Sequence, residues 1–168
     1  AAVLSLSAAG EAMCFPDTEP QDPLSLCRLF DGNGADELLV MDGSEKDQDH
    51  DANIGILKTM IRTVDIPVIT GGRVRRMEDV KKLIYAGCQK VFLNYAKESN
   101  IELTHEVSGK FGKQKIMASV HCKEALIEAF SHAQLLGGIL LPYTLADMAY
   151  QKAKELPKEN FPVKEATS

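Results

Sequence analysis

The chain has 168 residues, enough for one domain with a hydrophobic core. Its 45% hydrophobic and 26% charged residues are typical of a globular protein, and its net charge of −5 argues against broad nucleic-acid binding. No apolar run is long enough to cross a bilayer, and no basic leader precedes the first apolar segment. We therefore expect a cytoplasmic protein whose four cysteines are buried free thiols.

Short apolar runs alternate with longer amphipathic segments along the chain. The expected strands cover residues 2–7, 36–42, 66–70, 90–94, 115–120 and 137–143, with a hairpin return at 11–15. The expected helices cover residues 23–34, 52–64, 77–87, 100–112, 122–135 and 144–156. Three of these helices have candidate caps, namely Asp22, either Asp49 or Asp51, and Thr144. This order predicts a domain over residues 1–156, followed by a C-terminal tail at 157–168.

The spacing of these elements predicts a fold of the α/β class. Strands recur about every 25–30 residues, which is the length of one βα unit. They are continuously apolar, as expected for a parallel sheet that helices cover on its faces. Two architectures fit this pattern, an open doubly wound sheet and a (βα) barrel.

Several polar or flexible residues stand where expected strands end. Gly71 and Gly72 close one strand, and a paired glycine either ends the strand or lets the backbone approach a ligand. Asp42 ends another strand, where it could position a substrate or cap a turn. His121 follows a third and is either an acid–base group or a polar residue at a strand end. No histidine has metal-ligand spacing, and we expect no metal or cofactor.

A family resemblance runs from about Asp22 to Val120. The segments "DPLSLCRLFDGNGADELLVMD", "IPVITGGRVRRMEDVKKLIYAGCQKVFLN" and "FGKQKIMASV" resemble the histidine-biosynthesis (βα)8 barrels. That family includes the cyclase subunit of imidazole glycerol phosphate synthase and the phosphoribosylformimino-aminoimidazole carboxamide ribotide isomerase. The resemblance favours a (βα) TIM-type barrel, and with five to six βα units visible we expect it to be partial or truncated.

The resemblance also implies a phosphate site built from two turns. Members of the family hold a substrate phosphate with backbone N–H groups after two neighbouring strands. The matching positions here are Gly71 and Gly72 in one turn, and Asn94, Tyr95 and Ala96 in the other.

Two residues near this expected phosphate site depart from the family pattern. Arg73 stands where the family commonly has a third glycine, and Tyr95 stands where it has a small hydroxyl residue. Arg73 would add charge toward the phosphate, whereas Tyr95 would crowd it.

The proton-transfer positions implied by the resemblance are altered. The family uses one aspartate at the end of strand 1 and one at the end of strand 5 as general acid and base. Ser7 and His121 occupy those positions here, so we expect the parent chemistry to be lost. The alternatives are an active enzyme of the family, in which His121 and Asp42 do altered acid–base work, and a βα interaction module without phosphate binding.

The length of the chain bears on its partners. A barrel of this type takes about 250 residues. The chain is therefore expected to be a fragment, to pair with a second copy, or to lack internal segments. Degenerate cyclase-like barrels are also found fused to a phosphoribosyl-AMP cyclohydrolase domain. The expected ligand is a phosphorylated small molecule, with no nucleic acid or membrane as partner.

Overall fold

A computed structural model describes residues 2–14, 19–156 and 163–165. The chain forms two compact units, described separately below. Unit 1 comprises residues 2–74 and 78–91, and unit 2 comprises residues 75–77 and 92–165. The boundary between them falls inside strand β5 (Lys90–Asn94).

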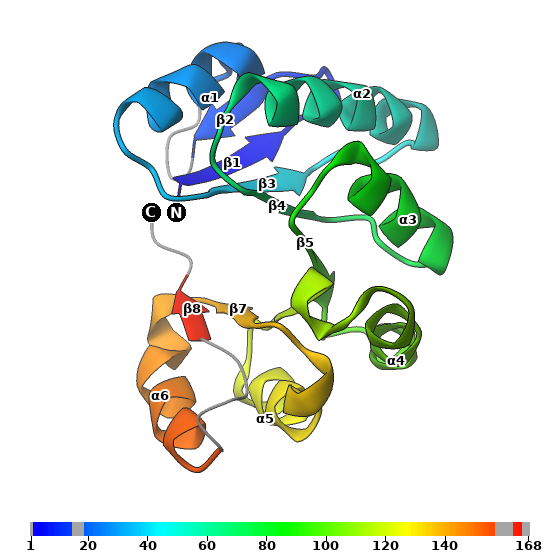
Figure 1. The fold of residues 1–168 in the computed structure, drawn as a ribbon, viewed down its shortest axis with the longest axis vertical. Helices are drawn as coiled ribbons and strands as arrows, with labels where there is room; N and C mark the ends of the chain where they lie inside the picture. The colour runs from blue at the N-terminus through cyan, green and yellow to red at the C-terminus, as the bar shows by residue number, and fades with distance from the viewer. Residues whose placement is uncertain (1, 15–18, 157–162, 166–168) are drawn as a thin grey trace. The chain divides into compact units, whose positions relative to one another are not determined.

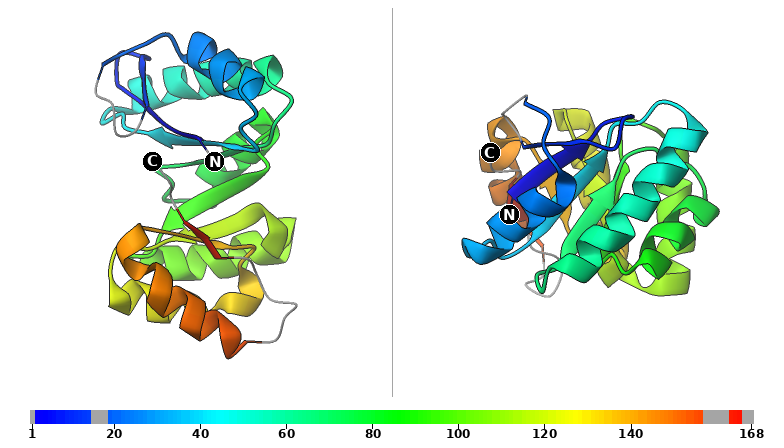
Figure 2. Two further views of the ribbon diagram at one scale, coloured as in Figure 1. Left: turned by 90° about the vertical axis from the view of Figure 1, so that its left-hand side faces the viewer. Right: turned by 90° about the horizontal axis from the view of Figure 1, so that it is seen from above.

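Unit 1 begins with two short strands, after which helices and strands alternate along the chain. Its strands are β1 (Ala2–Leu6), β2 (Ala12–Cys14), β3 (Leu38–Asp42) and β4 (Val68–Gly71), in the order β2-β1-β3-β4. β1 and β2 form an antiparallel hairpin, whereas β1–β3 and β3–β4 are parallel pairs. Its helices are α1 (Pro23–Gly32), α2 (Asp47–Thr63) and α3 (Met77–Ala86). Helices α1 and α2 lie on the same face of β1 and β3 (Figures 1 and 2).

Unit 2 repeats the same alternation of strand and helix. Its strands β6 (Ile116–Ser119), β7 (Ile139–Leu141) and β8 (Val163–Glu165) are parallel neighbours. Its helices are α4 (Ser99–Phe111), α5 (Lys123–Ser131) and α6 (Ala146–Lys154). The 3-10 turns η1 (Lys113–Lys115), η2 (Ala133–Leu135) and η3 (Tyr143–Leu145) precede or follow these helices.

The predicted fold class is confirmed. Successive parallel strands separated by helices make the fold α/β and of the (βα) TIM-type barrel, here partial. The domain and tail predicted at 1–156 and 157–168 stay predictions. β8 forms within that tail segment, and the rest of the segment lies outside the described residues.

The hydrophobic core of unit 1 follows the periodicity of its elements. Leu38, Leu39 and Val40 follow one another along β3 and are all at most 4% exposed, as expected for a parallel strand covered on both faces. Leu57 and Met60, one turn apart on α2, are buried as well. This packing fixes the rotation of α2, and thereby decides which of its polar residues face the strands.

Two predicted helix caps are wrong, whereas a third is confirmed. The Asp22 carboxylate accepts a hydrogen bond from the N–H of Ser25 at 2.9 Å, as predicted for α1. Helix α2 begins at Asp47 rather than after Asp49 or Asp51, because carboxylates are stabilised inside the first turn by the helix dipole. Thr144 lies within η3, and α6 begins after Leu145.

The expectation that all four cysteines are buried is also wrong. Cys27 and Cys88 are buried, but Cys14 is half-buried and Cys122 is exposed. Cys122 lies in the bend before α5, where its side chain remains on the surface instead of packing with the strand residues.

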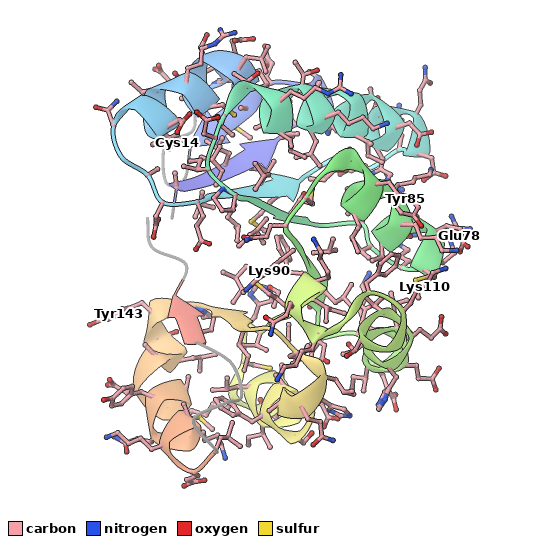
Figure 3. The ribbon with its side chains drawn as sticks, viewed as in Figure 1. Cys14, Glu78, Tyr85, Lys90, Lys110 and Tyr143 are labelled. Carbon is pink, nitrogen blue, oxygen red and sulfur yellow. The ribbon has the colours of Figure 1, made fainter. Side chains whose placement is uncertain are left out.

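Large apolar side chains also reach the surface, including Tyr85 on α3 and Tyr143 in η3, which are 73% and 79% exposed (Figure 3).

None of the helices in the described part of the chain is both long and apolar enough to span a membrane.

Candidate functional site

A small pocket opens in unit 1 where β3 and β4 end. Its cavity volume is only about 10 Å³, room for about one water-sized group, and it is partly open to solvent. Five of its lining residues are apolar and come from β1, β3, α2 and α3; the others are Asp42, His50, Asn53 and Thr70, which are polar, and the glycines Gly71 and Gly72. Two of the predicted site segments, the end of β3 and the glycine pair, therefore meet in one pocket.

The carboxylate of Asp42 accepts hydrogen bonds from three donors. Its Oδ1 accepts from the N–H of Ser44 and from Nδ2 of Asn53, both at 2.9 Å. Its Oδ2 pairs with Nδ1 of His50, which lies one turn before Asn53 on α2. Burial alone would raise the pKa of Asp42, but the hydrogen bonds from His50, Asn53 and Ser44 outweigh it and lower the pKa below its ordinary value. Asp42 is therefore an ionised carboxylate whose position is fixed by three hydrogen bonds.

Asn53 connects this cluster to the end of β1. Its Nδ2 also donates to the carbonyl oxygen of Ser7, at 3.1 Å. The Ser7 hydroxyl points elsewhere, because it accepts from the N–H groups of Ala9 and Glu11 at 3.2 Å and so organises the hairpin between β1 and β2. Ser7 thus contributes its backbone to the cluster, and its side chain to a turn.

The corner after β4 requires glycine at one position. Gly72 has φ +92°, and a Cβ atom there would lie 2.6 Å from the backbone oxygen of Asp42. Only glycine permits both this left-handed backbone and this contact between β4 and β3. The corner therefore brings the glycine pair against the end of β3, beside the Asp42 cluster.

Arg73 continues the corner in the same backbone region. It is the one non-glycine residue among the described residues with positive φ, at 57°. The family resemblance places a glycine here, and the backbone keeps the conformation that glycine favours. Nη2 of Arg73 pairs with Asp47 Oδ1 at 2.5 Å, while its Nη1 is buried and has no hydrogen-bond partner among the described residues.

The second predicted phosphate turn lies in unit 2, and its backbone donors are engaged. The N–H of Tyr95 donates to Ser119 O at 3.0 Å, and that of Ala96 donates to Asn94 Oδ1 at 2.9 Å. The Tyr95 ring is buried, and its hydroxyl is 2.8 Å from Thr104 Oγ1. Burial raises the pKa of the Tyr95 phenol, although the Thr104 hydrogen bond opposes the shift. The Tyr95 side chain therefore faces the interior of unit 2.

His121 is exposed in unit 2, two residues after β6. No group of three or more His, Cys, Asp or Glu side chains within the described ranges could hold a metal ion.

The sequence interpretation missed His50 and Asn53. Both lie in "DQDHDANIG", in which the sequence pattern singled out only Asp49 and Asp51, as candidate helix caps. The detectable signal was their spacing of three residues, which places two polar side chains on one helical face amid buried Ile54 and Leu57.

Comparison with known proteins identifies the family. The model of the family described as "Histidine biosynthesis protein" matches residues 16–155. The chain belongs to the histidine biosynthesis protein family. One curated relative is "Imidazole glycerol phosphate synthase subunit HisF" from Frankia casuarinae, with 37% identity over 102 residues. The match covers 61% of this chain and 40% of that relative, so the chain spans less than half of the relative's length.

Proposed function

We propose that the chain is a cyclase-like barrel domain of histidine biosynthesis that binds a phosphorylated ligand of the ribonucleotide type. The family match over residues 16–155 carries this proposal. The relative is named as an imidazole glycerol phosphate synthase subunit, which supports a phosphorylated ligand for this chain too. We further propose that a fused histidine-pathway domain or a second chain completes the barrel.

We propose that the phosphate binds at the corner formed by Gly71, Gly72 and Arg73. The family resemblance places a phosphate turn at this corner, and Gly71 and Gly72 line the pocket beside it. Arg73 directly follows the glycine pair in the chain and brings a guanidinium suited to phosphate oxygens, one of whose nitrogens has no hydrogen-bond partner among the described residues. The turn at Asn94, Tyr95 and Ala96 is the family's second phosphate turn, but two of its N–H groups already donate within unit 2.

We propose that the paired acid–base chemistry of the family is lost in this chain. A serine hydroxyl exchanges no proton near neutral pH without a base beside it, and the Ser7 hydroxyl serves a hairpin turn instead. His121 could still titrate, but a single group does not replace a pair.

Titration calorimetry of the chain with a bisphosphorylated phosphoribosyl imidazole ribonucleotide tests phosphate binding. The nucleoside that lacks both phosphates serves as the reference ligand, and we expect binding that depends on the phosphates. Arg73→Gln should weaken binding by roughly tenfold, because it removes a charged hydrogen bond. Lys58→Gln, the same loss of charge at an exposed position on α2, should leave the affinity unchanged. Equal binding of both ligands would refute the proposal.

The second candidate is an active enzyme of the same family, favoured by the exposed imidazole of His121 at a strand end. Turnover of a phosphoribosylformimino ribonucleotide that disappears in His121→Ala would establish this candidate. Binding without turnover supports the degenerate domain. If the chain shows neither binding nor turnover, the remaining alternative is a βα interaction module that binds no phosphate.

A further inference from the structure

The hydrogen bonds around Asp42 determine which nitrogen of His50 carries a proton. Asp42 is an ionised acceptor held by Ser44 and Asn53, so the nitrogen that faces it must donate. That nitrogen is Nδ1 of His50. In the neutral ring, Nε2 is consequently left with a free lone pair and acts as a hydrogen-bond acceptor.

Nε2 of His50 is a buried polar atom whose hydrogen-bonding capacity is unused among the described residues. His50 is 8% exposed, and its Nε2 has no hydrogen-bond partner among the described residues. The ring lines the pocket that Gly71 and Gly72 also line. A buried polar nitrogen without a partner is costly, so a ring held in this way is suited to accept a hydrogen bond from an incoming group.

The surroundings of Nε2 define the kind of group it can take. An anion is disfavoured, because the lone pair and the Asp42 carboxylate behind the ring both repel negative charge. Leu6, Leu57 and Leu83 line the same pocket, and an apolar wall of this kind disfavours a charged group in direct contact with Nε2. A neutral hydroxyl or N–H donor fits both restrictions.

We propose that Nε2 of His50 accepts a hydrogen bond from a sugar hydroxyl of the ligand, next to the corner that receives its phosphate. This inference rests on the proposed function and assigns a second contact within the same site. His50 contacts the ligand, whereas Asp42 and Asn53 are positioning residues that fix the ring. His50, held by Asp42 and Asn53, thus binds the sugar, and the corner at Gly72 and Arg73 binds the phosphate.

Two amide variants of His50 separate its two ring nitrogens. Asn at this position can keep a donor near Asp42 but places nothing where Nε2 stood. Gln extends its amide toward the Nε2 position and restores a polar group there. Calorimetry with ribose 5-phosphate and with inorganic phosphate then separates the sugar contact from the phosphate contact.

We expect the wild-type chain to bind ribose 5-phosphate more tightly than phosphate. His50→Asn should lose roughly fivefold to tenfold in affinity for ribose 5-phosphate, as expected for one hydrogen bond, and keep its affinity for phosphate. His50→Gln should recover part of the loss. An unchanged affinity of His50→Asn for ribose 5-phosphate would overturn the inference alone. A wild-type chain that binds the bisphosphorylated ribonucleotide but neither probe would overturn the inference alone, and one that binds none of the three would overturn the proposed function as well.

The positioning role of Asp42 can be tested separately by nitrogen NMR of the His50 imidazole, which shows which ring nitrogen carries the proton. The wild-type ring should carry its proton on Nδ1 at neutral pH. Asp42→Asn can donate its own amide to Nδ1 and should move the proton to Nε2, as the equivalent change does in serine proteases. Affinity for ribose 5-phosphate should fall together with that change. A proton on Nε2 already in the wild-type ring would contradict the inference.

Discussion

At the scale of single residues, the Asp42 carboxylate organises the pocket. Its three donors come from its own turn and from two successive turns of α2 on one helical face, so the end of β3 and the start of α2 are held together by one side chain. Hydrogen bonds to an ionised group are the stronger kind, and they favour the charged form of the acid.

The lowered pKa of Asp42 predicts how stability depends on pH. Because the folded pKa lies below the ordinary value of 3.8, the contribution of Asp42 is fully present above about pH 4 and is lost as the pH falls through the folded pKa. Urea unfolding at pH 7 and at pH 3 measures this loss. Asp42→Asn should lower the unfolding free energy at pH 7 and reduce its difference between the two pH values. An undiminished difference would show that Asp42 is not the group responsible.

His50 and Asn53 show where inference from the sequence stopped. Asp42 was singled out because it ends an apolar strand, and the structure places it in the pocket. Its partners sit 8 and 11 positions further along the chain, on a helix that begins earlier than its sequence signals indicate. The start of α2 decides which residues face the strands, and charged residues alone did not locate that start.

At the scale of elements, the corner between β4 and α3 depends on a backbone that only glycine adopts easily. Gly72→Ala should lower the unfolding free energy by at least about 2 kcal/mol, because the added carbon meets the immovable backbone of Asp42 in a strained conformation. Gly55→Ala on α2 is the matched control, since nothing lies within 4 Å of the added atom there. That variant should gain about 0.5–1 kcal/mol from helix propensity. Chemical denaturation of the two variants measures both, and equal effects would contradict the role given to the corner.

Strands were easier to predict than helix ends. The apolar runs "LLVM" and "KVFLN" led directly to β3 and β5, because short continuous apolar runs are typical of strands in a covered parallel sheet. Helix ends depend on competing caps, and the sequence around Thr144 did not show that Pro142 is followed by a 3-10 turn. The short β8 carries no periodic signal of its own and was missed.

At the scale of the whole molecule, the rate at which each cysteine is alkylated shows whether the chain around it is folded. Burial, aided by the nearby Asp22 charge, raises the pKa of the Cys27 thiol to about 11, so only about one in a thousand is thiolate at pH 8. Iodoacetamide followed by mass spectrometry should modify Cys122 within minutes and Cys27 only after unfolding in urea. In Cys122→Ser, the early label should disappear. Modification of Cys27 at the rate of Cys122 would show that unit 1 opens readily.

The carboxamide of Asn53 has a consequence for the order of assembly. It joins Ser7, 46 positions before it, to Asp42 across two strands and a helix, so it can form only once all three have come together. A contact of this kind belongs to the late stages of folding. Its removal should leave the refolding rate nearly unchanged and accelerate unfolding, which makes this amide a determinant of how long the native unit persists once formed.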